Sequence, residues 1–323
     1  MNLIEKRLRT LDAWQQRHRI PGFTYAVLKK FGDDQAGNHV ALLTYFALLA
    51  TFPLLLALTA ILGLVLKGNS ALQISIQNSA LTEFPIIGTQ INSQIGLSSL
   101  GHSAPALTVG IFGAILGGRG LANTVQNMQN TLWNVPKVNR PGFPFNYLRS
   151  FALLGLLGLG TVLTATAATL MGAGQVIGLT GFSLKILTVA LSTLIGVGLF
   201  FAGFRISAAK VVASRDLLLG AILSSVAWQI LLSLARIIVS NDLKHAQAIA
   251  GFFGIVLGLV AWFGLQATAI VYAVEADVVR AHHLWPRSII QPPLTQADKK
   301  YLVETASVER RRFEEKITIE FTE

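Results

Sequence analysis

The stretch VALLTYFALLATFPLLLALTAILGLVL, residues 40–66, is a run of 27 residues without a single charge. Crossing the hydrocarbon core of a bilayer takes about 20 apolar residues at about 1.5 Å each. Helices of soluble proteins do not need such a run. Lipid requires it, because every backbone polar group must be satisfied inside the helix. The stretch therefore predicts a membrane-spanning helix.

The composition of the rest of the chain extends this pattern. Of 323 residues, 52% are hydrophobic and 13% are charged, with a mean hydropathy of +0.57, whereas soluble domains average about 25% charged residues. Five more apolar runs follow the first. We expect an all-α fold, a bundle of six transmembrane helices with amphipathic helices at the membrane surfaces, and spans at about 40–66, 104–121, 150–172, 183–204, 217–239 and 249–274.

The net charge of +10 is distributed as in a membrane protein rather than a nucleic-acid-binding one. The segments outside the spans alternate between rich and poor in Lys and Arg, and alternate segments hold 22 against four of these residues. Positive residues stay on the cytoplasmic side of inserted proteins. This pattern predicts a multi-pass membrane protein with cytoplasmic segments at 1–39 and 276–323, and no nucleic acid partner.

The stretch ILGGRGLANTVQNMQNTLWNVP, residues 115–136, has two interpretations. Its glycines around Arg119 resemble a phosphate-binding loop, but the lysine and the preceding strand of such a loop are missing. The favoured interpretation is a helix end with an arginine at headgroup level. Apolar residues then recur at helical spacing, so the helix is expected to continue along the membrane surface and to end at Pro136.

Two terminal segments are predicted to form further helices. Near the N-terminus, apolar residues share one face of a predicted helix and basic residues lie off that face, which indicates an amphipathic helix that ends at Pro21 and Gly22. This helix either lies on an anionic leaflet or packs on the protein's own cytoplasmic loops. The apolar residues are Ile4, Leu8, Leu11 and Trp14. Near the C-terminus, Thr295 and Asp298 fit a capping box. We expect a regulatory or disposable helix there, followed by strand-like alternation at Ile317, Ile319 and Phe321.

Small residues in the predicted spans favour close helix packing. Gly113 and Gly117 form a GxxxG pair, the spacing that lets two helix backbones approach in lipid. Pro53 removes a backbone hydrogen bond from the first span and is expected to kink it. The segment 68–103 between the first two spans is expected to carry uncharged amphipathic helices at the outer surface.

Three stretches resemble a known family in order and spacing. ALLTYFALLATFPLLLAL (41–58), LANTVQNMQNTLWNVP (121–136) and GFFGIVLGLVAWFGLQATAIVYAVEADVV (251–279) are similar to segments of the YihY/BrkB family of integral membrane proteins. The resemblance covers about residues 25–280. It implies the six-span layout, a place in the bacterial inner membrane and a role in the cell envelope, but no defined biochemical activity.

Members of that family have carried a ribonuclease label, for which this sequence offers no chemistry. Metal-dependent hydrolysis needs clustered His and carboxylate ligands. The six histidines fall on both sides of the predicted membrane and lack ligand spacing with carboxylates: His18, His39, His102, His245, His282 and His283. With no cysteine, thiolate sites are also excluded. We therefore expect no enzyme, no metal and no cofactor.

Charges near the lipid core are expensive and are candidates for function. We expect Arg119, Arg205 and Glu275 to meet on the cytoplasmic side of one cavity that accepts an anionic headgroup, since arginine suits phosphate. The alternative is that these side chains snorkel to the surface and pair structurally. Further candidates for the site and its path are Tyr45, Asp216, Gln229, Arg236 and Gln266.

Three classes of function fit these features. The first is a transporter or flippase for lipid or amphipathic envelope material, with membrane lipids, anionic ones included, as partners. The second is a non-transporting scaffold in envelope assembly, acting as a homo-oligomer or with an assembly partner. The third is an enzyme or channel. Without a nucleotide-binding motif, transport would be downhill, gradient-driven or dependent on a partner.

Overall fold

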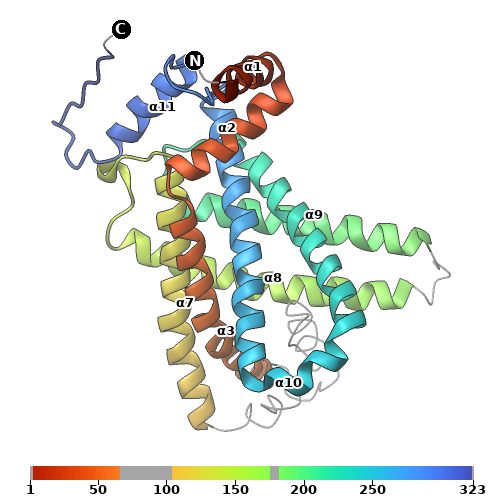
Figure 1. The fold of residues 1–323 in the computed structure, drawn as a ribbon. Coiled ribbons are helices and arrows are strands. Elements are labelled where there is room, and N and C mark those ends of the chain that lie inside the picture. Colours follow the sequence, from red (N-terminus) through yellow and green to blue (C-terminus); the bar gives the residue numbers. More distant parts are fainter. Residues whose placement is uncertain (1–2, 66–103, 175–181, 322–323) are drawn as a thin grey trace.

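A computed structural model describes residues 3–65, 104–174 and 182–321, and every regular element within these ranges is a helix (Figure 1). The predicted all-α class is confirmed for this part of the chain. The predicted amphipathic helices at 68–103 lie outside it. The elements are α1 (Leu3–Arg17), α2 (Arg19–Asp33), α3 (Gly37–Val65), α7 (Ala104–Leu132), η1 (Lys137–Asn139), α8 (Phe145–Gly174), α9 (Phe182–Ser207), η2 (Ser214–Leu217), α10 (Leu218–Ala281) and α11 (Gln296–Ser307).

Within the described ranges, four segments are long and apolar enough to cross a membrane. They are Phe145–Thr164, Ile186–Ser207, Ser214–Ala235 and Val256–Ala281. The first two predicted runs fall in α3 and α7, which are 29 residues each, and their crossing of a membrane stays a prediction. The structure is therefore that of a helical membrane-type protein, while the bundle of six spans remains an expectation.

Helix α10 holds the last two predicted spans in one helix of 64 residues, where the sequence predicted two helices. Figure 1 shows how it folds back on itself, with a first limb leading away from α9 and a second limb returning. The backbone N–H of Gly220 in the first limb donates to Oδ1 of Asp277 in the second, at 2.7 Å. Leu232 and Leu259 pack in one buried cluster farther from this contact. The element is therefore a helical hairpin whose two limbs are in contact at Gly220 and Asp277.

Helices α3 and α7 pack side by side (Figure 1), and the GxxxG pair makes the close approach that was predicted. A Cβ on Gly113 would lie 2.9 Å from Cβ of Pro53, and one on Gly117 would lie 3.2 Å from Cα of Ala50. The glycines of this region are inside α7, so they form no phosphate loop. Helix α7 continues unbroken past Arg119 to Leu132, which confirms the expected continuation of the helix toward Pro136.

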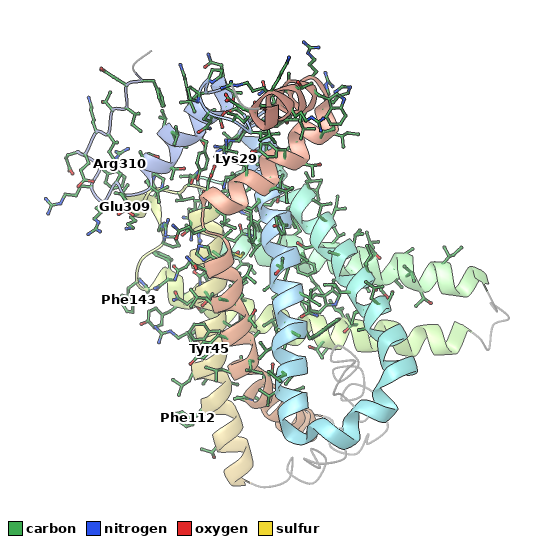
Figure 2. All side chains as sticks on the ribbon, viewed as in Figure 1. Lys29, Tyr45, Phe112, Phe143, Glu309 and Arg310 are labelled. Atoms are coloured by element: carbon green, nitrogen blue, oxygen red, sulfur yellow. The ribbon has the colours of Figure 1, made fainter. Side chains whose placement is uncertain are left out.

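Helices α8 and α9 form a second hairpin, which in Figure 1 crosses the direction of α3 and α7. Large apolar side chains of this hairpin point outward, and Leu194 is 67% exposed. On the α7 side of the molecule, Phe112 and Phe143 also project outward (Figure 2). Such outward apolar surface suits a lipid surrounding, because lipid tails are as apolar as leucine.

Helices α1, α2 and α11 gather at one end of the molecule, where both chain termini lie (Figure 1). We call this group the cap. Pro21 is the third residue of α2, in the first turn where its missing N–H costs no helical bond. It therefore does not end the N-terminal helix as predicted; α1 ends at Arg17 instead.

Beyond α11 the chain runs back along η1. The Val138 N–H donates to the Arg310 carbonyl at 3.0 Å, and Lys137 pairs with Glu309 at 2.6 Å; Figure 2 shows Glu309 and Arg310 at this edge. The described part of the predicted strand, up to Phe321, forms no strand.

The close contact inside the α10 hairpin predicts a strong effect of one methyl group. A Cβ on Gly220 would lie 2.3 Å from Oδ2 of Asp277 and 2.9 Å from the Ala273 carbonyl. Gly220→Ala should therefore lower the free energy of unfolding by about 1–3 kcal/mol, the usual cost of overpacking. Denaturant titration in detergent micelles would measure it. Gly198→Ala in α9, where nothing lies within 4 Å, should be neutral or stabilising, and equal losses in both variants would contradict this packing.

Candidate functional site: a buried charge cluster and a polar seam

Three helices, α2 of the cap and its neighbours α7 and α10, end close together and in the same way. Gln35, Asn134 and His283 follow α2, α7 and α10 with positive φ angles of 50°, 49° and 54°. After each, the next N–H bonds back into the last turn: Ala36 to Phe31, Val135 to Asn130, and Leu284 to Val279, at 2.9–3.0 Å. This is the Schellman arrangement, which satisfies terminal carbonyls of a helix.

Lys30 of α2 lies where these helix ends converge, and its side chain is 0% exposed. Its ammonium donates to Oε2 of Glu275 at 2.8 Å, to the Leu132 carbonyl at 2.8 Å and to Oδ2 of Asp34. An ammonium has three N–H donors, so all of them are used. Helix C-termini carry partial negative charge, which further favours a cation here.

Electrostatics keeps this lysine charged despite its burial. Burial alone would lower the pKa of the Lys30 ammonium, but Glu275 and Asp34 outweigh it and hold the pKa above the ordinary value for lysine. Tyr301 of α11 donates to Oδ1 of Asp34 at 2.6 Å. Burial raises the pKa of the Tyr301 phenol, and Asp34 adds to that rise, so the phenol stays a neutral donor.

A second charged group ties the segment after α10 to α2. The buried Asp298 carboxylate accepts from Lys29 at 3.1 Å, from Nε of Arg287 at 2.8 Å, and from Ser288 and Thr295. Burial would raise the pKa of Asp298, but these hydrogen bonds hold it well below its usual range. The capping box of Thr295 and Asp298 is confirmed.

Arg287 completes this second group. Its side chain is 2% exposed, pairs with Asp33 at 3.0 Å, and lies 4.3 Å from the ring centroid of Tyr301. The two neighbouring lysines thus bind different carboxylates, Lys30 that of Glu275 and Lys29 (labelled in Figure 2) that of Asp298. The first part of the tail is therefore built into the cap, and a regulatory or disposable role of the helix near the C-terminus stays a prediction.

Helix α1 is held to the C-terminal segment of the chain by two hydrogen bonds. Gln15 donates to the Arg287 carbonyl at 2.7 Å, and Asp12 accepts from the Ile289 N–H at 3.0 Å. Its polar face therefore packs on the protein's own C-terminal segment. The apolar face points outward, and Leu11 and Trp14 are each 50% exposed.

Polar side chains also lie on the inner faces of the α10 hairpin. Ser224 is one turn from Gly220, and Gln266 is three turns from Asp277, so both share the face of the contact between the limbs. All three side chains, Ser224, Gln266 and Asp277, are buried, and each has a polar atom without a hydrogen-bond partner among the described residues. We call this set the polar seam. A buried polar atom left without a partner costs about 1–3 kcal/mol.

The three residues predicted to form one anion site have separate partners. Arg119 stacks on the Tyr147 ring at 4.0 Å, and Arg205 donates to the Val212 carbonyl at 2.9 Å. Glu275, expected to compensate an arginine, binds Lys30. Among the described residues, no ion pair or hydrogen bond joins the three.

The other candidates are spread over the molecule. Tyr45 is half exposed beside Phe46, Gln229 is half-buried, and Gln266 lies in the polar seam. Asp216 lies at η2, where its carbonyl accepts from Arg280 at 3.1 Å. Arg236 is in α10, but its side chain is outside the described part.

Sequence reasoning missed Lys30, although a signal was present. The buried residues of α2 are Gly22, Ala26, Val27 and Lys30, so the lysine recurs at helical spacing on the apolar face. Lys29 beside it lies off that face. A lysine on an apolar stripe, one turn before Asp34, predicts a buried ion pair rather than a snorkelling charge.

The cluster predicts that Lys30 is essential to stability. Lys30→Met leaves Glu275, Asp34 and the Leu132 carbonyl without their cation, so the free energy of unfolding should fall by about 3–5 kcal/mol, as for other broken buried pairs. Denaturant titration would measure the loss, with the exposed Lys6→Met as the charge-matched control. The loss should shrink in a Glu275→Gln background, and strictly additive losses would refute the pairing.

The lowered pKa of Asp298 predicts how the stability of the cap depends on pH. Because its pKa is depressed in the folded protein, it stabilises the fold above its unfolded pKa, about 4, and this stability is lost as the pH falls below that value. Thermal melting of the wild type should therefore drop steeply below about pH 4. Asp298→Asn should melt earlier at pH 7 and show a shallower acid dependence. Glu314→Gln, at an exposed position, should behave as the wild type, and an unchanged acid slope in Asp298→Asn would count against this role.

Comparison with known proteins gives a family match that covers most of the chain. A family model described as "Virulence factor BrkB" matches residues 27–293, from α2 through the Arg287 segment. The match therefore takes in Lys30, Glu275 and the whole polar seam, and it extends beyond the resemblance seen in the sequence. No curated protein and no solved structure matches the chain.

Proposed function

The chain belongs to the BrkB virulence factor family, and from this premise we propose that it is an inner-membrane transporter or flippase for lipid or other amphipathic envelope material. In this proposal it crosses the membrane six times, with both termini in the cytoplasm. The supporting observations are six apolar runs and a Lys and Arg count of 22 against four in alternate segments. It acts as a carrier, without catalysis of its own.

The polar seam is the main observation that supports this proposal. Gln266 is 6% exposed, and its amide nitrogen has no hydrogen-bond partner among the described residues. It lies in the segment Val256–Ala281, which is long and apolar enough to cross a membrane. Polar groups kept inside such segments are expensive and by default functional. Together with Ser224 and Asp277, Gln266 supplies hydrogen-bonding groups along a route through the hairpin that a polar headgroup needs.

A scaffold in envelope assembly is the second candidate, and one observation favours it. The exposed Leu11 and Trp14 of α1 offer an apolar contact surface on the cap, suited to an assembly partner or a second copy of the chain. A scaffold does not need unpartnered polar atoms between membrane helices, so the polar seam favours transport.

Transport is tested with the full chain in vesicles of phosphatidylethanolamine and phosphatidylglycerol containing a fluorescent phosphatidylglycerol. Dithionite destroys the fluorescence of the outer leaflet only, so any further loss reports lipid movement from the inner leaflet. We expect that further loss with the wild type and a rate about tenfold lower with Gln266→Leu, the factor for ~1.4 kcal/mol in a barrier.

Thr268→Val is the matched control for this assay. Its hydroxyl already bonds the Gly264 carbonyl at 2.7 Å, so the substitution removes a polar group that is not available to a headgroup. Its rate should equal that of the wild type. Equal fluorescence loss with and without protein would reject lipid transport and leave the scaffold.

A further inference from the structure

Two arginines from different helices hold the same short linker. Arg149, near the start of α8, donates to the Ala208 carbonyl at 2.8 Å, and Arg205, near the end of α9, donates to the Val212 carbonyl at 2.9 Å. Both carbonyls belong to the linker 208–213 between α9 and η2. The fold therefore brings together two guanidinium groups that are 56 positions apart in the sequence.

No acidic side chain in the described part of the chain compensates this arginine pair. No ion pair among the described residues includes Arg149 or Arg205, and a neighbouring charge that acts on Arg149 is that of Arg205 itself. Two like charges at close range repel. Each guanidinium has five N–H donors, is only partly buried and makes one hydrogen bond within the described ranges, so an anion that relieves the repulsion can use the other donors.

The surroundings of the pair are apolar and exposed. Leu148, next to Arg149, is 61% exposed, Phe145 one turn earlier is 63% exposed, and Val211 in the linker is 63% exposed. Both arginines also lie at ends of candidate membrane spans, Phe145–Thr164 and Ile186–Ser207. A cationic pair at the end of two spans, flanked by apolar surface, matches a ligand with an anionic head and apolar chains.

We propose that Arg149 and Arg205 bind the phosphate of a membrane phospholipid, whose chains lie along Leu148, Phe145 and Val211. Arginine suits this role because its planar fork donates two parallel hydrogen bonds to phosphate oxygens. The site is distinct from the polar seam and binds lipid whether or not the chain moves lipid. Its test measures binding alone, so it succeeds or fails independently of the transport assay.

Native mass spectrometry of the full chain, released from detergent micelles with added lipid, measures the binding. Phosphatidylglycerol should be retained by the wild type, and diacylglycerol, which lacks phosphate, should not. The double variant Arg149→Gln/Arg205→Gln should bind phosphatidylglycerol at least about tenfold more weakly, since both charge-assisted contacts are lost. Arg149→Lys/Arg205→Lys should be intermediate, because charge remains but the fork is gone.

Arg215→Gln is the matched control. It removes the same charge from nearby η2, where the Arg215 side chain is 90% exposed, and it should bind phosphatidylglycerol as the wild type does. Inorganic phosphate is added in a further arm. If it displaces phosphatidylglycerol completely at millimolar concentration, the ligand is free phosphate and the lipid assignment is overturned.

A measurement on the wild type keeps the proposal testable if the glutamine variants do not fold. Phosphatidylglycerol should slow hydrogen–deuterium exchange of the backbone amides in the linker 208–213, and diacylglycerol should not. Unchanged exchange with phosphatidylglycerol would overturn the proposal, as would equal lipid retention by the folded double variant and the wild type.

Discussion

The ammonium of Lys30 is the contact on which the cap depends. It joins α2, the end of α7 and the second limb of α10 through three acceptors, two carboxylates and the Leu132 carbonyl. Desolvating an ion costs several kcal/mol, which is offset only when geometry and hydrogen bonding are good. Here three donors meet three acceptors at the negative ends of helices. The arrangement tolerates little displacement of any one helix.

The last turns of α10 connect this cap to the membrane helices. Glu275 and Asp277 are two residues apart, so they point to nearly opposite sides of the helix. Glu275 binds Lys30 in the cap, while Asp277 accepts the Gly220 N–H inside the hairpin. A rotation of the second limb would break both contacts together. The orientation of the polar seam is therefore set by the same helix end that anchors the cap.

The helices and much of their packing could be predicted from the sequence, because they follow from local patterns. Long uncharged runs require helices in lipid, and the spacing of Gly113 and Gly117 predicted a close helix contact, which the structure places against α3. The charged partners could not be predicted in the same way. Lys30 and Glu275 are separated by 245 positions, and no spacing rule states which helix faces which. Arg205 was recognised as a candidate from the sequence. That Arg149 lies near it could not be predicted, because this depends on how the hairpin of α8 and α9 packs.

The contacts of the cap also constrain the order in which the protein can assemble during synthesis. Helices α1 and α2 are made first, but their partners Glu275, Arg287, Asp298 and Tyr301 are made last. A ribosome synthesises the chain from its N-terminus at about 5–20 residues per second, so Lys30 cannot pair with Glu275 until the last predicted span has been made. Closure of the cap is then the final step of assembly. A chain that ends before Glu275 lacks the carboxylate that pairs with Lys30, and the ammonium on α2 is then left without this buried partner.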